Sequence, residues 1–161
     1  MNETDSLPER SRLVQQHLAE AGLDVQIRFL PDSARTAKEA ATAIGCEVGA
    51  IANSLVFVAD GAPLLVLTSG AHRVDVEVLA SSAGVSSLAM APAALVRETT
   101  GQAIGGVAPV GHPSPITTVI DQALQEYDEI WAAAGHPHTV MPLTFSSLRD
   151  LTGANVVAVA R

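Results

Sequence analysis

The residue types that could support chemistry in this chain gather between positions 101 and 112, in the stretch GQAIGGVAPVGH. This stretch holds four of the twelve glycines of the chain, together with Pro109. Glycine permits backbone dihedrals that a Cβ forbids, so a ligand can closely approach main-chain N–H and C=O groups. A tight turn at the edge of a sheet is typical of the same composition. The sequence therefore leaves two interpretations open, a turn and a ligand-binding loop.

Three polar side chains are further candidates for a site. His112 ends the glycine-rich stretch, and its ring either bonds to nearby backbone or acts as a substrate-facing donor or acid/base near neutral pH. Asn53 and Ser54 interrupt an apolar run at 51–59. An amide and a hydroxyl in such a run need hydrogen-bond partners, so they either bond to neighbouring backbone at a strand end or face a cavity.

Other catalytic chemistry has little support in the sequence. No phosphate-binding loop, dinucleotide fingerprint, zinc-protease motif or hydrolase nucleophile elbow is present. His136-Pro-His138 is the nearest approach to a metal-ligand pair, but proline between two histidines is more typical of a turn, so we expect no metal and no cofactor. Cys46 follows a helix-ending glycine and reads as a structural thiol. A serine triad could draw only on residues without supporting spacing: His112, Ser54 or Ser69, and Asp75 or Asp121.

Composition restricts the class of protein. The 161 residues are 48% hydrophobic but only 3% aromatic, which favours one globular domain with an aliphatic core. The formal net charge of −8 gives no bulk attraction for nucleic acid, and we expect no DNA partner. Five of the nine basic residues lie in the first 38 positions, so any phosphate contact depends on the N-terminal third. We expect neither a membrane span nor a signal peptide, and the single cysteine excludes an internal disulfide.

The elements that must position these residues follow from capping and periodicity. Ser6 to Glu9 reads as a capping box for a helix that ends at Gly22, and residues 24–30 alternate Val25, Ile27 and Phe29 on one face of a strand. Thr36 to Glu39 is a second capping box for a helix ending at Gly45. Two apolar runs, 51–59 and 64–68, flank Asp60-Gly61 as a hairpin.

The rest of the chain continues this mixture of elements. Asp75 and Thr144 are expected to cap helices at 76–83 and 145–151, and another helix follows Pro92. Further strands are expected at 86–90, 116–121, 129–134, 139–143 and 155–160, with a short helical turn at 123–127. Consecutive strands argue for an α+β fold with a mixed, barrel-like curled sheet flanked by helices, built from about seven strands and four or five helices.

Taken together, these motifs resemble the YbaK/prolyl-tRNA-synthetase-associated editing domain family. The element Gly105-x-x-x-Pro109 is its most specific part. The match runs from about residue 31 to 161, and residues 1–30 add an N-terminal helix and strand to the same domain, 1–161. The other matching segments are TAKEAA at 36–41, Ile44-Gly45, IANSLVF at 51–57, Arg73-Val-Asp75, Thr100-Gly101, Gly111-His112, Asp121 and Ala134-Gly135.

The resemblance implies a freestanding cytoplasmic deacylase that acts on the acceptor end of an aminoacyl-tRNA. Such proteins hydrolyse the ester of a wrong amino acid, typically on tRNA for proline, without a metal or a nucleophilic side chain. Backbone groups of the Gly-x-x-x-Pro loop hold the ester, and a water attacks with help from the terminal ribose hydroxyl. The catalytic residues implied are Asn53, Gly105, Gly106, Pro109 and His112. The substrate-binding residues implied are Thr36, Ser54, Leu55, Ser69, Gly70, His72, Val107, Gly111, Asp121 and Gly135.

The glycine-rich loop suits this chemistry. Main-chain N–H donors stabilise charge that develops on an ester carbonyl oxygen, and each well-placed donor contributes about 2.7–4 kcal/mol. Apolar side chains nearby would exclude water and select substrates by size. We expect this of Ile104, Val107, Leu55 and Leu67.

One position departs from the family pattern. Asn53 stands where relatives typically carry a lysine. Asparagine can still form hydrogen bonds, but it lacks the positive charge of lysine. Two alternatives therefore remain beside the deacylase. One is a non-catalytic module that binds tRNA ends or an amino-acid-like ligand, and the other is a hydrolase of a different small aminoacyl ester.

Overall fold

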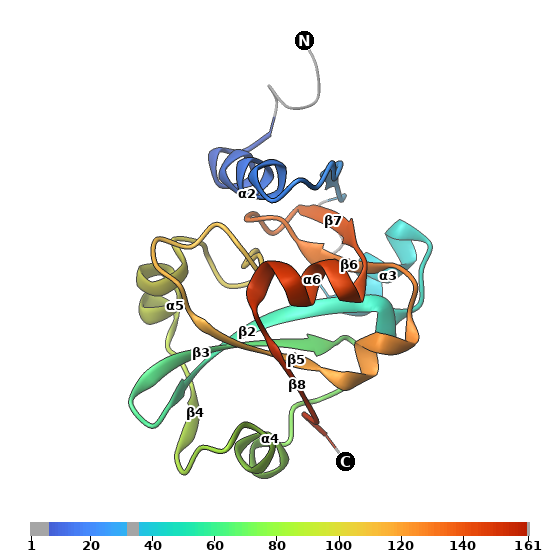
Figure 1. Cartoon of the computed structure of the whole chain (residues 1–161). Helices are drawn as coiled ribbons and strands as arrows, with labels where there is room; N and C mark the ends of the chain where they lie inside the picture. The colour runs from blue at the N-terminus through green and yellow to red at the C-terminus, as the bar shows by residue number, and fades with distance from the viewer. Residues whose placement is uncertain (1–6, 32–35, 161) are drawn as a thin grey trace.

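The fold is built on one mixed sheet of eight strands (Figure 1). The computed structural model describes residues 7–31 and 36–160. The sheet order is β1-β7-β6-β2-β3-β5-β8, and β4 pairs separately with β2. The strands are β1 (Arg28–Phe29), β2 (Ile51–Ala59), β3 (Ala62–Ser69), β4 (Leu88–Met90), β5 (Thr117–Asp121), β6 (Ile130–Ala133), β7 (Thr139–Leu143) and β8 (Asn155–Val157). This confirms the expected mixed α+β class.

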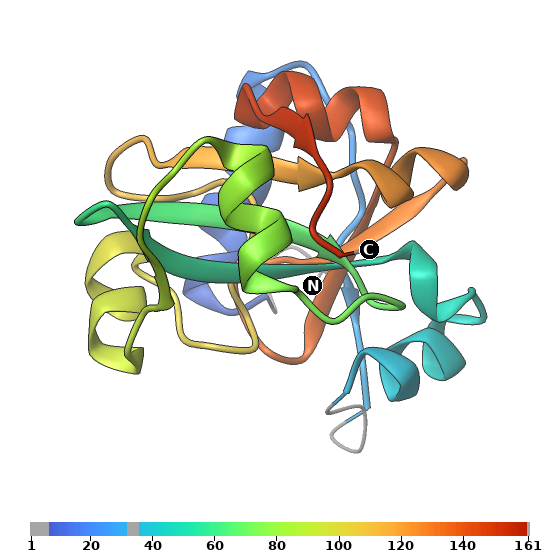
Figure 2. The same ribbon diagram turned by 90° about the horizontal axis from the view of Figure 1, so that it is seen from below.

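Five α-helices are described with the sheet. They are α2 (Glu9–Glu20), α3 (Ala37–Ile44), α4 (Val76–Ala83), α5 (Ala93–Thr100) and α6 (Phe145–Thr152), with short 3-10 helices η1 (Val48–Ala50) and η2 (Gln122–Glu126). Helices α2 and α6 lie on one side of the central strands and α4 on the other (Figures 1 and 2). Among the described residues, no helix combines the length and apolar character needed to cross a membrane.

Each face of the sheet buries its own apolar cluster. On the α2 and α6 side, Val14, Leu18 and Leu148 join strand residues such as Leu65 and Leu67. On the α4 side, Leu79 packs with Phe57, Val66, Val119 and Val157. Alternation along each strand sends neighbouring side chains to opposite clusters, which is why the central strands are apolar throughout.

Strand β2 is paired along the whole of one edge and only at the ends of the other. It pairs with β3 from Ala52↔Ser69 to Ala59↔Ala62, across the Asp60-Gly61 turn. On the opposite edge β6 pairs only with residues 51–52 and β4 only with residues 57–59. Between them Ala91 donates its N–H to Val56 O, 3.0 Å away. Residues 53–55 therefore have no partner strand on this edge within the described residues.

Side-chain caps begin three helices as expected. Thr36 Oγ1 accepts from Glu39 N (3.1 Å), Asp75 Oδ1 from Glu77 N (3.0 Å), and Thr144 Oγ1 from Ser147 N (3.0 Å). The first capping box was placed at Ser6, which lies outside the described residues. Helix α2 begins at Glu9, after Pro8, and Pro8 provides no side-chain cap.

The prediction of a strand at 24–30 is mostly wrong. Only Arg28 and Phe29 pair, and they pair with β7 at the edge of the sheet. Ile27 is 3% exposed whereas Phe29 is 51% exposed, so the two do not share a buried face. An edge segment with one neighbour lacks the second partner that would enforce alternation. The expected strands at 86–90 and 155–160 are likewise shorter, at Leu88–Met90 and Asn155–Val157.

Candidate functional site

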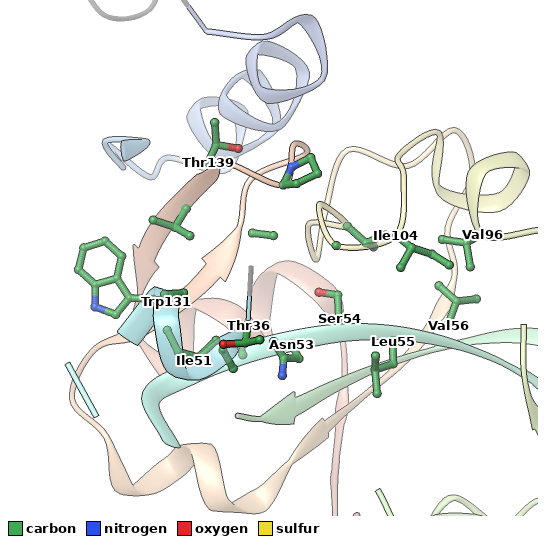
Figure 3. A pocket seen from close by; sticks show the side chains of 18 of the residues that line it. Thr36, Ile51, Asn53, Ser54, Leu55, Val56, Val96, Ile104, Trp131 and Thr139 are labelled. Carbon is green, nitrogen blue, oxygen red and sulfur yellow. The ribbon is translucent and has the colours of Figure 1, made fainter. Parts of the chain in front are cut away.

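A cavity of about 370 Å³ opens beside the unpaired edge of β2 (Figure 3). Its walls come from β2, the start of α3, strands β6 and β7, Val96 of α5, and the glycine-rich loop. This volume lies within the range of small-molecule sites. None of the lining residues is Asp, Glu, Lys or Arg, and most are apolar. The cavity therefore suits an uncharged group.

Strand alternation decides which polar side chains of β2 enter the cavity. Ser54 points into it, whereas the side chains of Asn53 and Leu55 project to the other side of the strand (Figure 3). Ser54 Oγ is buried and has no hydrogen-bond partner among the described protein groups. Asn53 and Leu55 line the cavity through the open edge of β2. The Asn53 side chain is directed to the opposite side of the strand from Ser54 (Figure 3), and its predicted role stays a prediction.

The glycine-rich loop presents two main-chain donors beside the cavity. Gly105 and Val107 both line it, and their N–H groups have no acceptor among the described residues. The alternate N–H groups are already bonded. Gly106 donates to Ala103 O at 3.0 Å, and Ala108 donates to Gln102 Oε1 at 2.6 Å. Of the predicted donors, only Gly105 and Val107 remain open to a ligand.

Gln102 holds the loop in shape from inside. Its side chain is 2% exposed, accepts from Ala108 N and donates through Nε2 to Val110 O at 3.3 Å. Thr100 Oγ1 accepts from Gln102 N and donates to Val96 O. Sequence reasoning missed this role of Gln102. A polar amide between Gly101 and an apolar run was the available signal, because a buried amide must bond to backbone.

Gly106 brings the loop against the turn that precedes β7. A Cβ placed on Gly106 would lie 2.7 Å from both His136 C and Pro137 N. Real Cβ atoms do not approach backbone so closely, so only glycine fits here. Gly106 thus joins the loop to the turn that contributes Pro137 and His138 to the cavity wall.

His112 lies outside the cavity lining. Its Nε2 is 2.8 Å from Ala108 O, and a carbonyl only accepts, so Nε2 carries the proton. Burial lowers the pKa of His112, and the nearby His17 acts in the same direction, whereas the bond to Ala108 opposes them. The hydrogen bond to Ala108 O matches the interpretation that His112 bonds to nearby backbone. No contact with the cavity supports its predicted catalytic role.

Two further glycines of the predicted set lie against helix α2. A Cβ on Gly135 would lie 3.0 Å from the backbone C and O of Arg10, and one on Gly111 would lie 3.1 Å from Val14 Cγ2. In this structure both glycines therefore allow α2 to pack closely, and it is α2 rather than the cavity that they face. Pro109, two residues before Gly111, also lies outside the cavity lining.

A separate polar cluster forms where β3 and β5 end. Asp121 is fully buried and its Oδ2 accepts from Ser69 N (3.0 Å) and contacts His72 Nδ1 (2.8 Å). Ser69 Oγ donates to Gly49 O at 2.7 Å rather than to a histidine, so no serine triad exists here. Gly70 sits beside this cluster, against Val48 O. These four predicted substrate-binding residues lie outside the cavity.

The structure brings together six of the predicted site residues. These are Thr36, Asn53, Ser54, Leu55, Gly105 and Val107. Of the four apolar residues expected to exclude water, Val107 is buried, Ile104 lies at the rim with 59% exposure, and Leu67 is not part of the lining. Sequence reasoning missed the cavity residues Met90, Trp131, His138 and Thr139, because β4 and the β6–β7 hairpin come beside β2 only through strand pairing.

The histidine pair and the cysteine are the remaining candidates from the sequence. The rings of His136 and His138 lie 5.5 Å apart, and among the described residues no three His, Cys, Asp or Glu side chains are grouped to hold a metal ion. Burial raises the pKa of the Cys46 thiol, which favours the protonated form over the nucleophilic thiolate.

Comparison with known proteins identifies the family and the fold. Residues 31–151 match the aminoacyl-tRNA editing domain family. A crystal structure of a candidate trans-editing enzyme for prolyl-tRNA synthetase superposes with a TM-score of 0.90 and 43% identity, over 96% of this chain and 99% of the other.

Two curated sequences extend the comparison. EbsC of Enterococcus faecalis, described as a candidate Cys-tRNA(Pro)/Cys-tRNA(Cys) deacylase, is 26% identical over 73% of this chain and 77% of its own. The proline–tRNA ligase of Lysinibacillus sphaericus is 29% identical over 66% of this chain, which corresponds to 18% of the ligase. Because the family model matches residues 31–151, well over half of the chain, and the fold agrees with that of the trans-editing enzyme, this chain belongs to the aminoacyl-tRNA editing domain family.

Proposed function

We propose that this protein hydrolyses the ester between a mischarged amino acid and the 3′ end of its tRNA, with tRNA for proline as the first candidate. One observation carries the proposal. The N–H groups of Gly105 and Val107 have no acceptor among the described residues, and they lie on the wall of a cavity whose described lining holds no Asp, Glu, Lys or Arg.

These donors suit the charge that ester hydrolysis creates. Water adds to the carbonyl carbon, and negative charge develops on the carbonyl oxygen. The bond to the ribose oxygen then breaks, and that oxygen leaves with a proton. Fixed N–H groups stabilise the oxyanion without reorganising, and removing one such donor lowers kcat by about 10²–10³-fold. The apolar walls keep bulk water from weakening these hydrogen bonds.

Cations for the tRNA backbone lie near the same cavity. Arg28 is exposed and sits over the ring of Trp131, 5.2 Å from its centroid, and Trp131 lines the cavity. Lys38 is exposed at the start of α3, one residue from the lining residue Ala37. We expect these two residues to contact the phosphates of the acceptor end.

A Gly105→Ala substitution tests the role of the loop. Gly105 has φ +93°, so alanine strains the loop and displaces the neighbouring N–H groups. We expect kcat for deacylation of mischarged tRNA to fall at least about tenfold. Gly153→Ala is the matched control, because Gly153 has φ +65°, no atom close to its would-be Cβ, and a place at the end of α6 outside the cavity.

The assay compares single-turnover deacylation of a panel of mischarged tRNAs by wild type, Gly105→Ala and Gly153→Ala. Equal loss in both variants would contradict the proposal, because it would report backbone strain alone. Binding of tRNA ends without turnover of any ester would favour the non-catalytic module, which the orientation of the Asn53 amide away from the cavity would then explain.

A further inference from the structure

Ser54 has a feature that the fold does not require. Its Oγ is buried and has no hydrogen-bond partner among the described protein groups, although it points into the cavity (Figure 3). A buried hydroxyl without a partner destabilises a protein by about 1–3 kcal/mol. Alanine at this position would avoid that cost. The hydroxyl therefore fits a group that enters the cavity.

The surroundings of Ser54 leave few other polar groups for that role. On its own face of β2 it lies between Ala52 and Val56, and its cross-strand partner is Leu67. The other hydroxyls of the lining are already bonded, since Thr36 Oγ1 accepts from Glu39 N and Thr139 Oγ1 bonds to Ser11 and His136. Among the described lining residues, Ser54 is thus the hydroxyl with no hydrogen bond at all, and it stands on an apolar floor apart from the open N–H groups of the glycine-rich loop.

We infer that Ser54 is a specificity-determining residue that selects aminoacyl groups with a hydroxyl on the side chain over their apolar isosteres. The inference rests on the proposed function and names its substrate class: small, neutral, hydroxylated aminoacyl esters. An ionised side chain is disfavoured because none of the described lining residues is Asp, Glu, Lys or Arg, so it would find no fixed opposite charge there.

The selection has a simple physical basis. A substrate hydroxyl and the Ser54 hydroxyl each donate and accept, so the two can satisfy one another. Alanine lacks the hydroxyl of serine, and valine replaces the hydroxyl of threonine by a methyl group of similar size, so either leaves Ser54 buried and unpaired, which opposes binding in ground state and transition state alike. The preference therefore acts on kcat/KM.

A double-mutant cycle between enzyme and substrate measures this contact. Wild type and Ser54→Ala are assayed on one tRNA charged with serine or alanine, and in a second set with threonine or valine. We expect wild type to favour serine over alanine by about tenfold or more in kcat/KM. In Ser54→Ala the ratio should fall to about one. Ser54→Thr keeps the hydroxyl and should retain a preference.

Thermal unfolding supplies a readout that does not depend on turnover. Ser54→Ala should be at least as stable as wild type, because it removes an unpaired buried hydroxyl. Ser69→Ala is the matched comparison and should lower the melting temperature, because Ser69 Oγ donates to Gly49 O and accepts from Ala71 N.

The outcomes separate the two proposals. An unchanged serine-to-alanine ratio in Ser54→Ala overturns the selection by Ser54 and leaves the deacylase intact. A marked loss of stability in Ser54→Ala also overturns it, because the hydroxyl would then have a structural partner. Absence of turnover on every ester by wild type overturns the deacylase and the inference together.

Discussion

Ser54 and Asn53 are adjacent in the chain and their side chains point to opposite sides of β2, so Ser54 is directed into the cavity whereas Asn53 lines it at the open edge of the strand. The sequence identified both as polar interruptions of an apolar strand. It could not assign their faces, because a run buried on both sides carries no alternation of polarity from which to fix the phase.

His112 presents a similar limit of inference at the residue scale. Its place after Gly111 suggested two roles, and only the fold reveals that Ala108 O accepts a hydrogen bond from its ring. Gln102 was missed altogether, because its partners Ala108 and Val110 lie six and eight residues further along a loop without regular hydrogen bonding. Irregular loops fix their contacts through tertiary packing rather than through a sequence period.

The lowered pKa of His112 predicts a specific loss of stability in acid. The unfolded chain titrates this ring near 6.5, whereas the folded protein binds the proton only at lower pH. Below pH 6.5 the unfolded state therefore binds more protons than the folded state. The contribution of His112 to folding stability is complete above pH 6.5 and is lost as the pH falls through the pKa of the folded protein. Urea denaturation of wild type and His112→Gln at pH 8 and at mildly acidic pH checks this.

His112→Gln should lose less stability than wild type between the two pH values, since glutamine can still donate to Ala108 O but does not titrate. His17→Gln is the comparison, because His17 is on α2 and influences His112 only through charge. Parallel pH dependence in wild type and His112→Gln would contradict the assignment.

At the scale of elements, capping and turn chemistry predicted where most helices and strands lie. Thr36, Asp75 and Thr144 cap their helices through the expected side chains, and Asp60-Gly61 closes the β2–β3 hairpin. These signals are local, so the sequence is sufficient for them. The pairing of β2 with β6 and β4 is not local, and the cavity between those strands was beyond what the sequence could place.

Helix α2 is the element that supports the site from behind. Ser11 Oγ bonds to Thr139 Oγ1 at 3.1 Å in a fully buried contact, and Thr139 lines the cavity. Gly135 and Gly111 allow the helix to pack against the loop and the turn. Although the family match begins at residue 31, the N-terminal helix is therefore part of the structure that holds the cavity in shape.

Gly135→Ala should separate this packing from simple backbone strain. Gly135 has φ +97°, and its Cβ would contact the Arg10 backbone at 3.0 Å. Gly84 has φ +72° with nothing within 4 Å, so Gly84→Ala reports strain alone. We expect Gly135→Ala to lower the free energy of unfolding by at least about 1 kcal/mol more than Gly84→Ala. Chemical denaturation measures the difference, and equal losses would contradict the docking of α2 on Gly135.

At the scale of the whole molecule, net charge limits the electrostatic attraction between the protein and tRNA. A net charge of −8 opposes long-range attraction, and the exposed cations near the cavity that we identify are Arg28 and Lys38. Contacts to two or three phosphates of a single strand predict a slope of about −1.4 to −2.1 in a plot of log K against log salt. Tight binding should therefore depend on the acceptor end in the cavity more than on the tRNA body.

A salt titration of tRNA binding to wild type, Arg28→Ala and Arg149→Ala tests this. Arg28→Ala should make the slope shallower by about 0.7, the value for one phosphate contact on a single strand. Arg149 is 51% exposed on α6, which contributes nothing to the cavity lining, and its replacement should leave the slope unchanged. A steep slope in wild type would mean that many more phosphates are bound.

The interrupted edge of β2 has a consequence for how such a pocket could diversify. Its width along the strand is set by where β6 stops pairing, at residue 52, and where β4 starts, at residue 57. Extending either strand by one paired residue would shorten the opening by about 3.3 Å, roughly two carbon–carbon bonds. The range of substrates in proteins with this architecture should therefore change in steps that correspond to one paired residue of a strand. Side-chain substitutions should provide the finer adjustment between those steps.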